Sequence, residues 1–156
     1  MPARPATPDD ADELVRLRAI MLQTFNDPRS WNDDWRPSSR ETLRQRLQGS
    51  SMAAFVVDRP DGTGLAACAV GIIEERLGSP ANPSGLVGYV FNVSTDPSYR
   101  RRGYSRACME ALLEWFRSHG VGTADLRASA DGEPLYADLG FVRTRDPAMR
   151  MRITRG

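Results

Sequence analysis

A turn of three consecutive arginines and a glycine is the part of this chain best suited to chemistry. Arg100, Arg101, Arg102 and Gly103 follow the β-like run 86–95 and lead directly into an amphipathic helical pattern. A helix N-terminus exposes unpaired backbone N–H groups and the positive end of the helix dipole. Guanidinium groups add charge and paired hydrogen bonds, and glycine permits a close approach of the backbone to a ligand. The segment therefore predicts a binding site for a phosphate or pyrophosphate group.

Two blocks of this chain are similar to signatures of the GNAT N-acetyltransferase superfamily. The first is Arg-x-x-Gly-x-Ser at residues 100–105, preceded by Val-x-Thr-x-Pro at 93–97. It resembles the Gln/Arg-x-x-Gly-x-Gly/Ala pattern with which that family grips the pyrophosphate of acetyl-CoA. The second is Leu-Tyr-Ala-Asp-Leu-Gly-Phe at residues 135–141, which resembles the family's late Leu-Tyr-x-x-Leu-Gly-Phe block. Ser105 departs from the pattern, because glycine or alanine is usual at that position.

The resemblance implies that acetyl-CoA is the acyl donor and that the strand end and the turn bind it. The residues implied are Val93, Thr95, Arg100, Arg101, Arg102, Gly103, Tyr104 and Ser105. In that picture, backbone groups of Val93 and Thr95 pair with the pantetheine arm, and the N–H of Val93 faces the thioester oxygen. The resemblance also implies that Tyr136 is the general acid that protonates the leaving thiolate. A phenol suits this role because an unperturbed tyrosine is protonated at neutral pH.

The general base is less well specified than the acid. Some members of the family place a glutamate on the strand before the arginine motif, but Tyr89 occupies that position here. The nearest carboxylates are Glu74 and Glu75, at the end of the preceding strand. Adjacent strand residues point to opposite faces, so at most one of the two reaches the site directly. A base acting through water is an equal alternative.

The segment 26–38 is the candidate element for recognising the acetyl acceptor. Trp31 and Trp35 flank carboxylates that include Asp34. Indole rings and carboxylates together suit a cationic or amine-bearing substrate. The alternative is a solvated loop whose tryptophans cover the core.

The remaining sequence supplies the elements that must position these residues. Apolar residues at helical spacing predict four helices, over residues 8–25, 38–49, 105–119 and 133–139. Runs typical of strands occur at residues 4–6, 52–58, 65–73, 86–95, 124–128, 142–145 and 149–153. This order predicts an α/β fold of GNAT type, with one mixed sheet of about six to seven strands and about four flanking helices. We expect a single N-acetyltransferase (GNAT) domain over residues 1–156.

Composition narrows the classes of partner. The chain has 156 residues, a formal net charge of +1 and one histidine. The near-neutral charge argues against nucleic acid as a partner, which would draw on a broadly basic surface. No apolar run is long enough to span a membrane and no signal-peptide pattern opens the sequence, so we expect a cytoplasmic protein. With one histidine and two isolated cysteines, Cys68 and Cys108, we expect no metal site and two reduced thiols.

These observations predict an acetyl-CoA-dependent N-acetyltransferase that acts on the amine of a small molecule or a peptide. A rival prediction is an acyl-CoA-binding sensor of the same fold with little turnover, because no obvious base is present. A third is nucleic-acid binding through residues 100–106, with Tyr104 stacking on a base. The sequence is compatible with a monomer or a homodimer.

Overall fold

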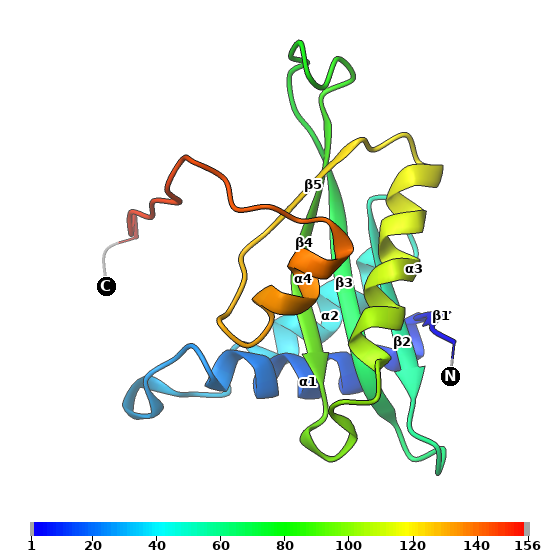
Figure 1. Ribbon diagram of the computed structural model, residues 1–156. Coiled ribbons are helices and arrows are strands. Elements are labelled where there is room, and N and C mark those ends of the chain that lie inside the picture. The colour runs from blue at the N-terminus through cyan, green and yellow to red at the C-terminus, as the bar shows by residue number, and fades with distance from the viewer. Residues whose placement is uncertain (1, 155–156) are drawn as a thin grey trace.

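The sheet is mixed, and its strands lie side by side in the order in which they occur in the sequence. The computed structural model describes residues 2–154 (Figure 1). Within them the strands are β1 (Arg4–Pro5), β2 (Met52–Asp58), β3 (Leu65–Glu75), β4 (Leu86–Thr95) and β5 (Thr123–Leu126). Strands β1 to β4 pair antiparallel, and β5 pairs parallel to β4. The parallel pair requires a crossover connection, which α3 provides.

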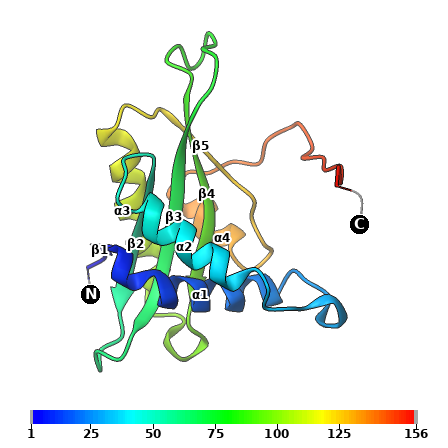
Figure 2. The same ribbon diagram turned by 180° about the vertical axis from the view of Figure 1, so that it is seen from behind.

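Helices cover both faces of the sheet. They are α1 (Ala11–Gln23), α2 (Arg36–Arg46), α3 (Tyr104–Ser118) and α4 (Glu133–Leu139). Figure 1 shows α3 and α4 in front of the sheet, and Figure 2 shows α1 and α2 across the opposite face. Leu14 and Leu17 of α1 and Leu112 of α3 are fully buried, each in the core on its own side. No helix within residues 2–154 has the length and apolarity needed to cross a bilayer.

The predicted α/β arrangement of one mixed sheet with four flanking helices is confirmed, but the sheet has five strands within the described residues rather than about six to seven. The strands predicted at 142–145 and 149–153 are absent, and this part of the chain runs away from β5 (Figure 1). Met149, Met151 and Ile153 alternate with polar residues as in a strand, yet all three are exposed. An alternating pattern forms a strand only where a neighbour pairs with it, and Pro147 separates the two predicted runs. The C-terminal segment accordingly has no regular structure up to residue 154.

A bulge and a divergence shape the middle of the sheet. Val70 pairs with Asn92 and Gly71 pairs with Val90, so Phe91 is an extra residue in β4. Such a bulge bends the strand that carries it and increases its twist. β5 pairs with β4 only as far as Val90, whereas β4 continues to Thr95. The last five residues of β4 are therefore not covered by β5.

An ion cluster fixes the end of β4. The Asp96 side chain is buried and accepts hydrogen bonds from Arg16 of α1 at 2.8 Å and from Arg59 of the β2–β3 hairpin at 2.7 Å. It also accepts the backbone N–H of Ser98 at 2.9 Å, at the start of the short 3₁₀ turn Pro97–Tyr99. Burial raises the pKa of Asp96, but these three donors outweigh burial and lower its pKa to about 2. The carboxylate is thus ionised in the fold and holds three distant segments together.

The depressed pKa predicts an acid-sensitive contribution to stability. Because the folded pKa is about 2 and the ordinary value is 3.8, the contribution is present above pH 3.8 and is lost as pH falls through about 2. We expect Asp96→Asn to lower the free energy of unfolding by about 2 kcal/mol at pH 7. Near pH 2 the difference between wild type and variant should be close to zero. Urea unfolding at both pH values measures it.

Asp138→Asn is the matched control, because Asp138 pairs with Arg106 at 2.7 Å at the exposed surface. An exposed ion pair contributes roughly 0.5 kcal/mol or less, so this variant should unfold nearly as wild type does. Equal losses in the two variants would contradict the role given to Asp96.

Candidate functional site

The arginine turn begins where the ion cluster ends and runs into α3. Two residues of this turn adopt left-handed backbone conformations, Arg101 with φ 64° and Gly103 with φ 77°. Gly103 occupies the N-cap position of α3, which no side chain caps. Left-handed geometry redirects successive N–H groups, and an uncapped helix start leaves its first N–H groups available. Backbone N–H groups in this geometry can donate hydrogen bonds to an anion.

The side chains of the turn add positive charge that the rest of the chain does not neutralise. Arg100, Arg101 and Arg102 are exposed, and none forms an ion pair within residues 2–154. The Arg102 guanidinium lies 5.1 Å from the centre of the Tyr99 ring. Arg106, one helical turn later, is instead paired with Asp138. Around the start of α3, the cations available to a ligand are thus Arg100, Arg101 and Arg102, which precede the helix.

A pair of hydroxyl groups joins β4 to α3. The side chains of Thr95 and Ser105 are hydrogen-bonded to each other. Ser105 is the residue that departs from the family pattern, and its hydroxyl is directed at the sheet rather than left unpartnered. This contact ties the last residue of β4 to the first turn of α3.

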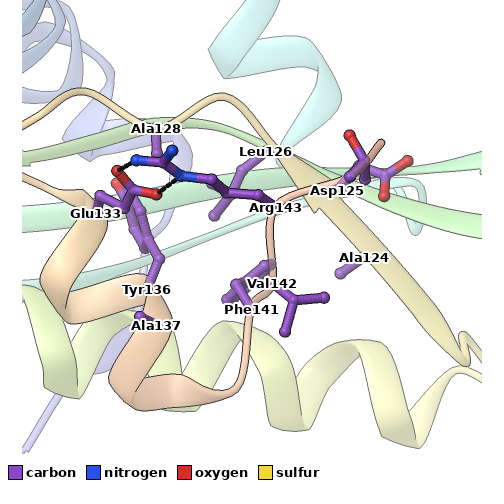
Figure 3. Close-up of a pocket in the computed structure, with 11 residues that line it drawn as sticks. Ala124, Asp125, Leu126, Ala128, Glu133, Tyr136, Ala137, Phe141, Val142 and Arg143 are labelled. Carbon is purple, nitrogen blue, oxygen red and sulfur yellow. Dashed lines mark hydrogen bonds and ion pairs between the residues drawn. The ribbon is translucent and has the colours of Figure 1, made fainter. Parts of the chain in front are cut away.

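Tyr136 lies on α4 between two cavities. One, of about 620 Å³, lies between β5, α4 and residues 141–144, where Glu133 and Arg143 form an ion pair (Figure 3). The other, of about 630 Å³, lies on the side of α1 and is lined by Val93 as well as Tyr136. No described residue hydrogen-bonds the Tyr136 hydroxyl, and burial raises the pKa of this phenol. The group is therefore a protonated donor at neutral pH, in the same cavity as Val93.

Glu74 and Glu75, considered as bases, lie at the other end of the sheet. Glu74 pairs with Val87 and Glu75 with Leu86 in the β3–β4 register, whereas Val93 pairs with Ala69. Five or more residues of strand separate them from Val93, roughly 17 Å along β3. Glu74 is also hydrogen-bonded to Arg76 at 2.8 Å. The structure does not bring either carboxylate together with Tyr136.

The tryptophan segment is also placed apart from the two cavities that Tyr136 lines. Trp31 and Trp35 pack edge to face with ring centres 5.9 Å apart, and the Trp35 indole N–H bonds the Asn32 carbonyl at 2.9 Å. Trp35 packs against the α1 side of the core, while Asp34 is exposed. Neither tryptophan nor Asp34 lines these cavities. Phe25, from the same connection, does line the α1-side cavity.

Sequence reasoning missed two residues of this region, Asp96 and Arg18. Asp96 occupies an unspecified position of the Val-x-Thr-x-Pro block, and its two arginine partners lie 80 and 37 residues away in the sequence. Arg18 lines the α1-side cavity together with Val93 and Tyr136. A signal for Arg18 was available, because it lies four residues after Leu14, on the apolar stripe of α1. A cation at an inward position of a helix indicates a buried partner or a ligand.

Comparisons with known proteins agree on one family. The model of the Acetyltransferase (GNAT) family matches residues 15–141. The mycothiol acetyltransferase of Acidimicrobium ferrooxidans is 28% identical over 148 residues, which are 88% of this chain and 46% of that protein. The ribosomal protein bS18-alanine N-acetyltransferase of Escherichia coli K12 is 42% identical over 55 residues, 33% of this chain and 37% of that protein. The chain thus spans less than half the length of these curated relatives.

Solved structures share the whole fold. A GCN5-related N-acetyltransferase from Ralstonia eutropha JMP134 superposes with a TM-score of 0.83 at 27% identity, covering 96% of this chain and 97% of that one. A predicted acetyltransferase from Clostridium acetobutylicum, determined with acetyl-CoA, also gives 0.83, at 21% identity, with coverage of 96% and 94%. The second likeness is one of fold alone.

The left-handed conformation at Gly103 predicts a measurable cost for any side chain there. A Cβ at Gly103 would meet no atom within 4 Å, so the cost is purely conformational. We expect Gly103→Ala to lower the free energy of unfolding by about 1 kcal/mol in urea titrations. Gly122→Ala is the control, because that site is equally open but its φ is not positive. It should change stability by less than roughly 0.5 kcal/mol, and equal losses at both sites would refute the explanation.

Proposed function

The chain belongs to the acetyltransferase (GNAT) family, and from that membership we propose that it transfers an acetyl group from acetyl-CoA to an amine acceptor, a small molecule or a peptide. One observation carries the proposal: the uncovered end of β4 leads into an uncapped helix start, flanked by three arginines that form no ion pair with any described residue. An anionic, extended ligand that lies along β4 and ends at this turn fits both features. Acetyl-CoA has that form, and it supplies the activated acetyl thioester.

We assign the pyrophosphate to the turn and the pantetheine arm to the edge of β4. Arg100, Arg101, Arg102 and the N–H groups of Gly103, Tyr104 and Ser105 supply the charge and the donors that a pyrophosphate needs. Past Val90, the backbone of β4 has no strand partner on the β5 side. Its amides there can pair with the amides of the arm, as a neighbouring strand would. In this assignment the N–H of Val93 faces the thioester oxygen, where a donor stabilises developing negative charge.

Tyr136 is the proposed general acid. Its hydroxyl is protonated at neutral pH, since burial raises its pKa, and it shares a cavity with Val93. A protonated phenol beside the reacting centre can donate its proton to the departing thiolate. Among residues 2–154, no carboxylate lines this cavity, so we assign the amine proton to solvent rather than to Glu74 or Glu75.

The sensor alternative is not favoured. The relatives that match this chain are named as acetyltransferases, and the site holds a candidate acid in addition to the anion-binding turn. A pure binding module would need the turn but not the acid.

Replacing Arg100 and Arg102 together with alanine tests the anchor. Acetyl-CoA should raise the melting temperature of wild type by mass action, and the double variant should lose most of that shift. Arg44→Ala with Arg46→Ala is the matched control, because these arginines have the same spacing on α2, away from the turn. A shift that survives in the turn variant, or disappears in the α2 variant, would overturn the assignment.

Tyr136→Phe tests the acid. Removing the hydroxyl should lower kcat by roughly 100-fold, the usual effect of a lost proton donor, while the melting shift given by acetyl-CoA stays as in wild type. Thiol release with an accepted amine measures kcat. An unchanged kcat would show that the thiolate takes its proton from another source.

A further inference from the structure

The α1-side cavity carries charge of one sign. Of the residues that the structure describes, three arginines line it, namely Arg18, Arg127 and Arg150, and no aspartate or glutamate does. None of the three forms an ion pair within the part of the chain that the structure describes. The cavity is therefore electropositive, in a protein whose formal net charge is only +1.

Arg18 is the most constrained of the three. It is half-buried, and its guanidinium makes one long hydrogen bond, 3.4 Å, to the Asn92 side-chain oxygen. Burial lowers the pKa of Arg18, although an arginine remains charged at neutral pH. Arg16, two residues earlier on the same helix, is instead bound to Glu13 and Asp96. A partly desolvated cation without an anion is unfavourable, so an arginine at this position points to an anion that comes from outside the chain.

The three arginines come from separate segments and meet around one space. Arg18 belongs to α1, Arg127 follows β5, and Arg150 belongs to the C-terminal segment. Arg127 and Arg150 are exposed, so they lie toward solvent while Arg18 lies deeper. Positive charge therefore extends from the solvent side of the cavity to Arg18, and this charge can attract an anion into the cavity.

The reacting end of the proposed site borders the same space. Asn92, the partner of Arg18, is adjacent in sequence to Val93, and both Val93 and Tyr136 line the cavity. Tyr89 and Phe91 supply aromatic surface on β4. A small molecule that binds here can therefore reach the cation and the proposed reacting centre together.

We propose that the cavity binds an acceptor amine that also carries an anionic group, a carboxylate or a phosphate, and that Arg18 is its anchor. The inference rests on the proposed acetyl transfer and names the acceptor class for that site. It places the acceptor at Arg18 rather than at the segment of Trp31, Asp34 and Trp35. It also adds an anionic group to the cationic or amine-bearing acceptor expected from the sequence.

A panel of amines on one short scaffold tests the charge preference. Ethanolamine is neutral beyond its amine, 1,2-diaminoethane adds a cation, β-alanine adds a carboxylate and phosphoethanolamine adds a phosphate. Thiol release from acetyl-CoA should give a kcat/KM at least about tenfold higher for an anionic member than for ethanolamine. β-Alanine and phosphoethanolamine separate the two anion chemistries. A preference for ethanolamine or for the diamine would overturn the proposal.

Variants of Arg18 test the anchor. Arg18→Gln should raise KM for the preferred anionic amine and reduce its advantage over ethanolamine by about tenfold, whereas Arg18→Lys should recover part of that advantage. Arg145→Gln is the control, because Arg145 is exposed on the C-terminal segment but does not line the cavity. It should keep the wild-type preference. An Arg18→Gln variant that lowers kcat/KM equally for all amines would show a structural role only.

A binding measurement separates this inference from the proposed function. Phosphoethanolamine or β-alanine should raise the melting temperature of wild type more than ethanolamine does, and Arg18→Gln should abolish the difference. If this holds while no amine releases thiol, acetyl transfer to amines of this class is refuted and the anion site stands. If no anionic amine shifts the melting temperature or is preferred in turnover, the anion site is refuted.

Discussion

The carboxylate of Asp96 is the contact on which the arrangement of the site depends. It lies where β4 ends and the arginine turn begins, and it binds α1, the β2–β3 hairpin and the turn through Arg16, Arg59 and the Ser98 N–H. A buried carboxylate is unfavourable unless several donors satisfy it. All three donors reach the carboxylate only when the three segments that carry them are in their native positions. The contacts that stabilise the fold therefore also fix the direction in which the chain leaves the end of β4.

Close packing of α3 on the sheet places the N-terminus of this helix beside the end of β4. The Phe116 ring of α3 lies over Gly71 of β3 and Gly88 of β4, and a Cβ at either glycine would approach it to 2.8 Å. Two glycines in neighbouring strands thus let the helix settle directly on the sheet. At the other end of α3, the Thr95–Ser105 hydroxyl contact holds the first turn beside β4. The uncapped N–H groups of the helix are positioned from both ends.

How far the sequence predicted this structure depends on whether each signal was local. The four helices, the first five strands and the arginine turn are contiguous patterns, and all occur close to where they were expected. Asp96 and Arg18 act through partners 80 and 74 residues away, which no local pattern reveals. The alternation at residues 149–153 predicted a strand, but alternation does not supply a neighbour. The pairing of β5 with β4 stops at Val90. This end point depends on contacts between the two strands, so no local pattern in the sequence reveals it.

The arginines of this chain fall into two groups. Some are paired with acids within the fold, and others are available to a ligand. Arg16 and Arg59 are neutralised by Asp96, and many other arginines are paired with nearby acids. Because acids and bases nearly balance over the whole chain, a local excess of positive charge arises only where the acids are elsewhere. Such an excess occurs at the arginine turn, residues 100–102, and again in the cavity that Arg18 lines. The anion binding proposed above at both places accounts for this distribution, whereas general basicity of the surface does not.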